Sequence, residues 1–396
     1  MKTFRIGLLV ERQRAYGRSF CEGAAAYAQE RSDISLGMLE WNDLHVGRKT
    51  EGYDAFVVRV LDDRMDKALR RTGKPVVDVF FGKDREGFAV VDLDNEAIAR
   101  LAAEHFHERG FRSFAYCGYN GVRFSDNRRD AFVRYVAALG GDCCVFNSPK
   151  SAVGAFADDV VRSEVYAPPA RERAMLVKWL RSLPSGTGVF CSHDLRAHQV
   201  LELCQSQGIE VPKDLAILGV DNDALLCGFT APTLSSIDPD GFQTGRNAVM
   251  AAVRIIKEGP SVRTMLRSFT PPKMLFSRES TEIYPLNPAW LSDALVFIHR
   301  NYMRGIGPND VFNHLGLSHT TVGRVFRSVR GTTVQNEILR IRMNEACRLL
   351  KTTGLSVKDI ARRTGFASDQ HFCHTFTSMM KASPVEWRRR ALAGEC

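Results

Sequence analysis

Long apolar runs are absent from this chain. None of its 396 residues falls in a stretch of the roughly 18 consecutive apolar side chains that a membrane-spanning helix needs. Near the amino terminus the only apolar run extends from Ile6 to Val10, and Glu11 and Arg12 end it. Such a run is too short for the core of a secretory signal. We therefore predict a cytoplasmic protein with no membrane partner.

Regularly spaced cysteines are missing as well. The ten cysteines are scattered, with one adjacent pair at Cys143 and Cys144 and no C-x-x-C. A zinc ribbon or a secreted disulfide framework needs better spacing than this. We interpret the cysteines as free thiols and expect no metal ion and no other cofactor.

The common enzyme motifs do not occur either. The segment after the first predicted strand, ERQRAYGRSF at 11–20, contains neither G-x-G-x-x-G nor G-x-x-x-x-G-K-[ST]. Neither H-E-x-x-H nor G-x-S-x-G is found in the chain. Paired catalytic carboxylates have no fixed motif, so an enzyme stays open as an alternative at this point.

The positive charge that is present is concentrated at one end. Residues 1–287 contain 38 Lys and Arg against 37 Asp and Glu, whereas residues 288–396 contain 16 against 8. Of the formal net charge of +9, a balance of +8 therefore lies in the last quarter. This asymmetry predicts a polyanionic partner for that quarter, and nucleic acid is the commonest one.

Short apolar runs alternate with amphipathic stretches over the first 285 residues. This alternation predicts parallel sheets with helices on both faces, and the length favours two lobes. The predicted strands are 4–10, 34–40, 55–60, 75–81, 89–93, 113–118, 143–147, 188–192 and 215–221. The predicted helices are 19–31, 95–108, 128–139, 171–182, 194–207 and 240–258.

The pattern changes after a breaker-rich segment, YPLNP at 284–288, and only helices follow. We predict an α/β domain over 1–284, a linker over 285–292 and an all-α domain over 293–396. Within the last domain, segments at about 310–327 and 356–379 have the pattern of a helix, a tight turn and a second helix. Gly316 and Gly365 would form the turns, and Ser318 and Ser368 would cap the second helices. A long amphipathic helix, 334–350, would pack the two halves together.

A helix-turn-helix places the start of its second helix in the DNA major groove. Polar residues at these starts are the candidates for reading bases: His319, Thr320, Thr321, Arg324, Ser368, Asp369, Gln370, His371 and His374. Basic residues elsewhere in the domain are the candidates for phosphate contacts: Arg327, Arg330, Arg340, Arg342, Lys358, Arg362, Arg363 and Lys381. Any one of the basic residues is explained equally well as a solvated surface charge.

Longer motifs in the same region are LGLS at 315–318, F-x-x-x-x-G at 326–331, SVKDIARRTGFASDQHFCHTF at 356–376 and SPVEWRR at 383–389. On these motifs, residues 293–391 resemble the DNA-binding domain of the AraC/XylS transcription regulators. The resemblance implies that the two units occupy successive major grooves on one face of the DNA. Gly323 departs from the pattern, because it removes a side chain from the first reading helix and costs about 0.5–1 kcal/mol of helix stability.

Polar residues follow several predicted strands of the α/β domain. Tyr16 and Arg18 follow the first strand, Asp194 follows 188–192, and Asp221 and Asn222 follow 215–221; Arg128 begins a helix. Ligands bind at the carboxyl ends of parallel strands, and carboxylates, amides, arginine and an aromatic face suit a small hydroxylated ligand. Three of these residues have an alternative, purely structural role. Asp194 would serve as a helix cap, Asp221 as a turn residue, and Tyr16 as an ordinary packing residue.

Further motifs in this domain are D-x-x-A at 194–197, GIEVPKDLAILGVDND at 208–223 and P-x-L-S-S-I at 232–237. They resemble the LacI-type, periplasmic-binding-protein-like sensor domain over about 3–285. The attachment of an AraC-type domain behind it, together with AYGRSFCEG at 15–23, is similar to the family of bacterial xylose-operon regulators. That resemblance implies a sugar effector, xylose or a related pentose, held by Arg128, Asp194 and Asp221.

We therefore predict a two-lobed α/β sensor domain followed by an all-α domain with two helix-turn-helix units. The function we predict is that of a transcription regulator, an activator of a sugar operon, which a sugar switches by binding between the lobes. Its expected partners are a double-stranded DNA operator, a second copy of the chain in a homodimer, and RNA polymerase. The alternatives are a solute-binding receptor and a sugar-modifying enzyme fused to DNA-binding helices.

Overall fold

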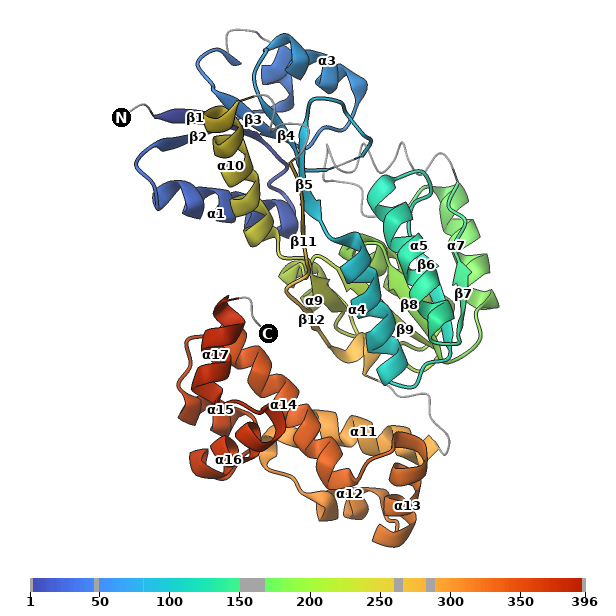
Figure 1. Cartoon of the computed structure of the whole chain (residues 1–396). Coiled ribbons are helices and arrows are strands. Elements are labelled where there is room, and N and C mark those ends of the chain that lie inside the picture. Colours follow the sequence, from blue (N-terminus) through green and yellow to red (C-terminus); the bar gives the residue numbers. More distant parts are fainter. Residues whose placement is uncertain are drawn as a thin grey trace. The chain divides into compact units, whose positions relative to one another are not determined.

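The computed structural model describes residues 3–45, 50–80, 82–149, 168–259, 266–282 and 289–393. The chain divides into two compact units, Met1–Thr281 and Glu282–Cys396 (Figure 1). The first unit contains two sheets of six strands, and the second is helical. This is the predicted fold class. Residues 285–288 of the predicted linker lie outside the described residues.

The first sheet forms one lobe of the first unit. Its strand order is β11-β5-β4-β3-β1-β2, and every neighbouring pair is parallel. The strands are β1 (Phe4–Leu9), β2 (Ile34–Met38), β3 (Ala55–Val58), β4 (Val76–Asp78), β5 (Ala89–Leu93) and β11 (Arg267–Thr270). The central strands are almost wholly apolar because both faces are covered, one by α1 (Ala15–Gln29) and α10 (Gly241–Glu258) and the other by α3 (Asp63–Arg71).

The second sheet forms the other lobe. Its order is β12-β10-β9-β8-β6-β7, parallel except for the antiparallel pair of β10 and β12. The strands are β6 (Ser113–Cys117), β7 (Asp142–Val145), β8 (Thr187–Cys191), β9 (Leu215–Val220), β10 (Ser235–Asp238) and β12 (Met274–Phe276). The helices of this lobe are α4 (Asn95–Glu108), α5 (Arg123–Ala138), α7 (Ala170–Ser182), α8 (Asp194–Gln207) and α9 (Ala224–Phe229).

The chain passes between the lobes three times, and these passages place the ends of strands from both sheets near one another. The passages follow β5, β10 and β11, so the carboxyl ends of β5 and β11 lead directly into the second lobe. Two helices begin earlier than the sequence predicts. α1 begins at Ala15 and not at 19, and α5 begins at Arg123 and not at 128, so that Tyr16, Arg18 and Arg128 lie within helices.

The early start of α1 depends on a glycine. A Cβ atom at Gly17 would lie 1.8 Å from the carbonyl oxygen of Glu11, so only glycine lets the segment after β1 pack against the first turn of α1. Strands β10, β11 and β12 and helices α3 and α9 are not in the sequence prediction. They are short, and in β11 the apolar Phe269 is exposed while the polar Thr270 is buried, so this strand shows no recognisable apolar alternation.

The second unit contains α11 (Ala289–Asn301), α12 (Pro308–Leu315), α13 (His319–Arg330), α14 (Val334–Thr352), α15 (Val357–Arg363), α16 (Asp369–Met380) and α17 (Pro384–Ala393). α12 with α13, and α15 with α16, are the two predicted helix-turn-helix pairs. Gly316 (φ 62°) and Gly365 (φ 77°) form their turns, and Ser318 and Ser368 cap the second helices, as predicted.

Helix α14 belongs to two separate apolar cores. Its first half contributes Ile338 and Ile341 to a core with α11, α12 and α13, and its second half contributes Ala346 and Leu349 to a core with α15, α16 and α17. The two helix-turn-helix pairs therefore lie at opposite ends of one helix (Figure 1).

Candidate functional site: an interlobe pocket and two DNA-reading helices

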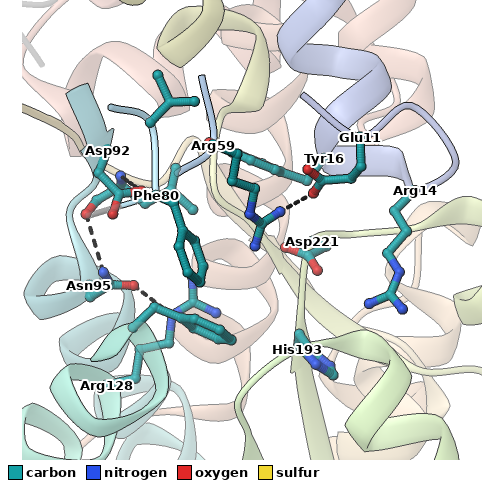
Figure 2. A pocket seen from close by; sticks show the side chains of 13 residues that line it. Glu11, Arg14, Tyr16, Arg59, Phe80, Asp92, Asn95, Arg128, His193 and Asp221 are labelled. Atoms are coloured by element: carbon teal, nitrogen blue, oxygen red, sulfur yellow. Dashed lines mark hydrogen bonds and ion pairs between the residues drawn. The ribbon is translucent and has the colours of Figure 1, made fainter. Parts of the chain in front are cut away.

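A small cavity lies between the lobes of the first unit, where strand ends from the two sheets meet (Figure 2). Its volume is about 60 Å³. Both lobes contribute to its wall. The lining residues are Glu11, Arg14, Tyr16, Arg59, Val79, Phe80, Asp92, Leu93, Asn95, Phe124, Arg128, His193 and Asp221.

Each lobe contributes an arginine that lies over a phenylalanine ring. In the first lobe the Arg59 guanidinium is 4.5 Å from the centre of the Phe80 ring, and it also donates to Glu11. In the second lobe the Arg128 guanidinium is 5.1 Å from the centre of the Phe124 ring. The two rings contact each other at the wall of the pocket, with their centres 6.3 Å apart and their planes tilted by 56°. The pocket therefore offers both flat apolar surfaces and fixed hydrogen-bond donors.

Arg128 is almost completely buried, with 3% of its surface exposed, and two hydrogen bonds hold its guanidinium in place. Its Nε donates to Oδ1 of Asn95 at 2.8 Å, and its Nη1 donates to the carbonyl oxygen of Ser192. Burial lowers the pKa of Arg128 from its ordinary value, and the charges of nearby acids, Asp221 first among them, oppose that effect. A buried guanidinium of this kind is a strong donor toward a polar ligand.

Asp221 owes its place in the pocket to an unusual turn. Asp221 (φ 111°) and Asn222 (φ 48°) both have left-handed backbone conformations directly after β9. The turn is held by Asp194, whose Oδ1 accepts from Oγ of Ser236 at 2.6 Å and whose Oδ2 accepts from the backbone N–H of Asp223 at 2.8 Å. Asp194 is 1% exposed and does not line the cavity. It therefore supports the turn from beneath.

Burial shifts the protonation of the acidic residues around the pocket. It raises the pKa of Asp92 to about 7. It raises the pKa of Asp221 to about 6, and the positive charges of Arg128 and Arg14 partly offset this effect of burial. Burial and the nearby Asp221 charge raise the pKa of Asp194 well above its ordinary value. Near neutral pH the pocket thus holds carboxyl groups that can either donate or accept hydrogen bonds.

Two further polar residues, Tyr16 and His193, line the cavity. The hydroxyl oxygen of Tyr16 is buried and makes no hydrogen bond to any residue that the structure describes. His193 is kept neutral because burial, and after it the charge of Arg14, lowers its pKa well below the ordinary value. Its Nδ1 accepts from the backbone N–H of Arg196 at 2.9 Å, so the neutral ring carries its proton on Nε2.

The starts of α13 and α16 form the corresponding surface of the second unit. His319, Thr320 and Arg324 of α13 are exposed, and Thr321 is half-buried beside the cap at Ser318. At the start of α16 the exposed residues are Asp369, Gln370, His371 and His374, together with the cap Ser368. Each start therefore presents a row of polar side chains to solvent, which is the arrangement that major-groove reading requires.

Five of the eight candidate phosphate residues are exposed, and the other three bind groups within the unit. Arg327, Lys358, Arg362, Arg363 and Lys381 are exposed. Arg342 is 6% exposed, and it donates to the carbonyl oxygens of Tyr302 and Ile306, so it joins helices inside the unit and does not face a phosphate. Arg330 and Arg340 pair with the buried side chain of Glu337.

No group of three or more His, Cys, Asp or Glu within the described residues is arranged to hold a metal ion. Nor is any helix in the described ranges long and apolar enough to cross a bilayer.

Comparisons with known proteins agree with both halves of this description. Residues 103–281 match a periplasmic binding protein-like domain, and residues 311–390 match a helix-turn-helix domain. The xylose operon regulatory protein of Escherichia coli K12 is 26% identical over 98% of this chain and 97% of its own length. The HTH-type transcriptional activator AarP of Providencia stuartii is 33% identical over 28% of this chain and 82% of its own length. The solved structure of the xylose-binding transcription activator XylR is 25% identical with a TM-score of 0.59, and the match covers 98% of both chains.

The chain thus joins a periplasmic binding protein-like domain to a helix-turn-helix domain, and over nearly its whole length it is similar to the xylose operon regulatory protein.

The matched helix-turn-helix domain and the names of these relatives indicate a DNA-binding transcription regulator. They favour this function over the two alternatives considered from sequence, a sugar-modifying enzyme and a plain solute receptor.

Three of the six predicted ligand residues line the pocket of this regulator: Tyr16, Arg128 and Asp221. The other three lie beside it. Asp194 supports the turn after β9. Oδ1 of Asn222 accepts a hydrogen bond from Nη2 of Arg278 at 2.7 Å. Arg18 is half-exposed, and its Nη2 lies 3.8 Å from Oδ2 of Asp223.

Sequence reasoning missed more of the lining than it found. The missed polar residues are Glu11, Arg14, Arg59, Asp92, Asn95 and His193, and the missed rings are Phe80 and Phe124. Some had a usable signal, because Asp92 is the last residue but one of β5 and His193 lies just after β8, and ligands bind at the carboxyl ends of parallel strands. Phe80 and Phe124 had none, since neither a loop phenylalanine nor a helical one marks a pocket by its spacing.

Proposed function

We propose that this regulator responds to a small neutral sugar, a pentose such as xylose, bound in the interlobe pocket. The observation that carries the proposal is the lining itself: two aromatic rings, with arginine and carboxyl groups from both lobes around them. Aromatic rings pack against the C–H faces of sugars, while paired donors and acceptors bind hydroxyl groups. The names of relatives that bind or regulate xylose support the same ligand class.

The protonation of the lining suits a hydroxylated ligand. Three arginines, Arg14, Arg59 and Arg128, lie beside three acids, Glu11, Asp92 and Asp221. Because burial raises the pKa of Asp92 to about 7 and that of Asp221 to about 6, these two carboxyl groups exchange between the neutral and the charged form near neutral pH. Such groups can donate to or accept from the hydroxyl groups of a neutral ligand.

The size of the cavity favours a monosaccharide. A single water needs about 10–15 Å³ of such space, so a cavity of about 60 Å³ holds roughly five waters. That number is close to the number of oxygen-bearing positions of a pentose. A disaccharide would have to force the lobes apart.

Tyr16 adds a reason to expect a hydroxylated ligand. A buried hydroxyl without a partner costs free energy, and a ligand hydroxyl beside it would remove that cost. Because the pocket is built from both lobes, a ligand that contacts Tyr16 and Arg59 on one side and Arg128 and Asp221 on the other favours the closed arrangement of the lobes.

On the DNA side, we assign base reading to the polar residues at the starts of α13 and α16, and phosphate contacts to Arg327, Lys358, Arg362, Arg363 and Lys381. α14 is 19 residues long and spans about 28 Å, close to the roughly 34 Å of one DNA turn. This length suits two reading helices in successive grooves. A homodimer that acts on chromosomal DNA in the cytoplasm and recruits RNA polymerase completes the proposal.

The test is thermal unfolding of the full chain with xylose, arabinose, ribose, glucose and cellobiose. A pentose at about 100 times its Kd should add about 2.7 kcal/mol to the free energy of unfolding. Cellobiose should add nothing. Asp221→Asn should lose the response, whereas Glu202→Gln, which removes the same charge from an exposed site on the same lobe, should keep it. A chain that no monosaccharide stabilises at millimolar concentration would contradict the proposal.

A further inference from the structure

A buried carboxylate lies where the first reading helix meets the helix that follows it. Glu337 is in the first turn of α14, and its side chain is 1% exposed. Its Oε1 accepts hydrogen bonds from Nη2 of Arg330 at 3.1 Å and from Nη2 of Arg340 at 2.8 Å, and its Oε2 accepts from Nε of Arg340 at 3.3 Å. Arg330 is the last residue of α13. One carboxylate thus ties the end of α13 to α14.

The carboxylate is ionised. Burial alone would raise the pKa of Glu337, but the hydrogen bonds and charges of Arg340 and Arg330 outweigh burial and hold the pKa below its ordinary value. Removing one member of such a group would leave a poorly compensated charge inside the protein. The geometry of the three side chains is therefore strongly preferred over any arrangement in which they separate.

The apolar contacts between α13 and α14 do not by themselves fix the angle of α13. Val322 and Phe326 of α13 pack against Ile338 and Ile341 of α14. Apolar packing is not directional, so it tolerates small rotations of a helix about its own axis. The hydrogen bonds from Arg330 to Glu337 are directional and add the missing constraint.

The same pairing turns two cations toward the protein. The side chain of Arg330 is 15% exposed and that of Arg340 is 37% exposed, and both point at Glu337. Arg324 and Arg327, on the same helix as Arg330, are exposed. Contacts between cations and phosphates raise affinity for every DNA sequence alike, whereas contacts with bases distinguish one sequence from another.

We propose that Glu337 is a specificity-determining residue of the DNA-binding domain: it withholds Arg330 and Arg340 from DNA phosphates and fixes the angle of α13, so that the first helix-turn-helix depends on base contacts. The inference depends on the family's DNA binding and not on the sugar. Loss of the carboxylate should then have two opposite effects. Affinity for arbitrary DNA rises, and discrimination between sequences falls.

The test uses the full chain and two duplexes of equal length: one selected from a random pool by the wild-type protein, and a scrambled one of the same composition. Glu337→Gln should tighten binding to the scrambled duplex several-fold at low salt and steepen the slope of log K against log salt by about 1–2, at about 0.9 per new phosphate contact. The preference for the selected duplex should fall about tenfold. Block substitutions in each half of the selected duplex should show the loss in one half only.

Glu386→Gln is the matched control, because Glu386 lies on α17, pairs with Arg390 and is 39% exposed. It adds the same charge to the domain, and the sequence preference should stay at the wild-type value. If Glu337→Gln and Glu386→Gln give the same salt slope and the same preference, the proposal is wrong. A uniform loss of affinity for both duplexes also overturns it, since that result indicates damage to the fold alone.

Glu337→Asp keeps the inference testable if the glutamine variant does not fold, as checked by circular dichroism and thermal unfolding. The shorter side chain keeps the charge but withdraws the carboxylate from Arg330 and Arg340. Its preference for the selected duplex should lie between those of the wild type and of Glu337→Gln. A preference equal to that of the wild type would count against the proposal.

Discussion

Oδ1 of Asn95 accepts a 2.8 Å hydrogen bond from Nε of Arg128, and both side chains are buried. Asn95 is the first residue of α4, directly after the passage from β5 into the second lobe. Arg128 belongs to α5 and lines the pocket. The guanidinium that we assign to the sugar is therefore oriented by the segment at which the two lobes are joined.

Asn95→Ala should weaken sugar binding by about 1–3 kcal/mol, or about 5- to 150-fold in Kd, because Arg128 loses an acceptor in a buried site. Isothermal titration of the full chain with the sugar found by thermal unfolding measures this. Glu96→Gln is the control: Glu96 is the next residue, but it is exposed and pairs with Arg134. Equal affinities for the two variants would show that Asn95 does not orient Arg128.

Tyr16→Phe should have effects of opposite sign on stability and on binding. The Tyr16 hydroxyl is buried without a hydrogen bond, so its removal should leave the sugar-free protein as stable as before or more stable by about 1 kcal/mol. Sugar affinity should fall about tenfold, because the ligand loses a partner. Thermal unfolding with and without sugar gives both numbers. Unchanged affinity would mean that Tyr16 is a packing residue, the alternative that its sequence position left open.

The pKa of Asp92, raised by burial to about 7 from an ordinary 3.8, predicts a pH dependence of stability. Between about pH 4 and pH 7 the unfolded chain releases this proton while the folded protein keeps it, so the free energy of unfolding falls as the pH rises. Asp92→Asn removes that dependence. At pH 8 the variant should be more stable than the wild type by about 2–4 kcal/mol, since one pKa unit corresponds to about 1.4 kcal/mol.

At pH 4 the Asp92→Asn variant and the wild type should unfold at nearly the same temperature, because the carboxyl group is then protonated in the folded protein and about half protonated in the unfolded chain, which leaves a difference of only about 0.6 kcal/mol. Thermal unfolding of the sugar-free protein across this range provides the comparison. A difference between the two proteins that does not change with pH would show that Asp92 is not held protonated by the fold.

Gly323→Ala should stabilise the second unit by about 0.5–1 kcal/mol, since alanine loses less backbone entropy in a helix. A Cβ at Gly323 would meet nothing within 4 Å, so no clash offsets the gain. Chemical unfolding followed by circular dichroism measures the change. Gly365→Ala is the contrasting variant: its Cβ would lie 2.0 Å from the carbonyl oxygen of Tyr302 at a φ of 77°, and it should destabilise the unit strongly.

The sequence predicted elements best where one signal was strong and local. α4 and α8 were predicted at their observed bounds, 95–108 and 194–207, and in the structure Asp94 caps the start of α4 and Gly208 ends α8. α1 was predicted to start too late because Gly17 and polar side chains weaken the helical pattern there. Only the contact of Gly17 with the Glu11 carbonyl explains that start, and it is a tertiary contact.

The pocket was predicted in part for the same reason. Asp221 followed from its place at a strand end, but sequence could not distinguish it from Asp194, which also follows a strand and lies beneath the turn. Glu11 and Arg59 come from two strand ends of one sheet, β1 and β3, and their meeting depends on strand order. Local pattern carries no information about which strands are neighbours.

The shared helix α14 has one more consequence. Because its halves are anchored in different cores, one inserted or deleted residue between Ile341 and Ala346 would rotate one helix-turn-helix about 100° against the other and shift it by about 1.5 Å. Only one of the two would then still face the duplex. Natural variants of this regulator should therefore keep the length of that stretch unchanged.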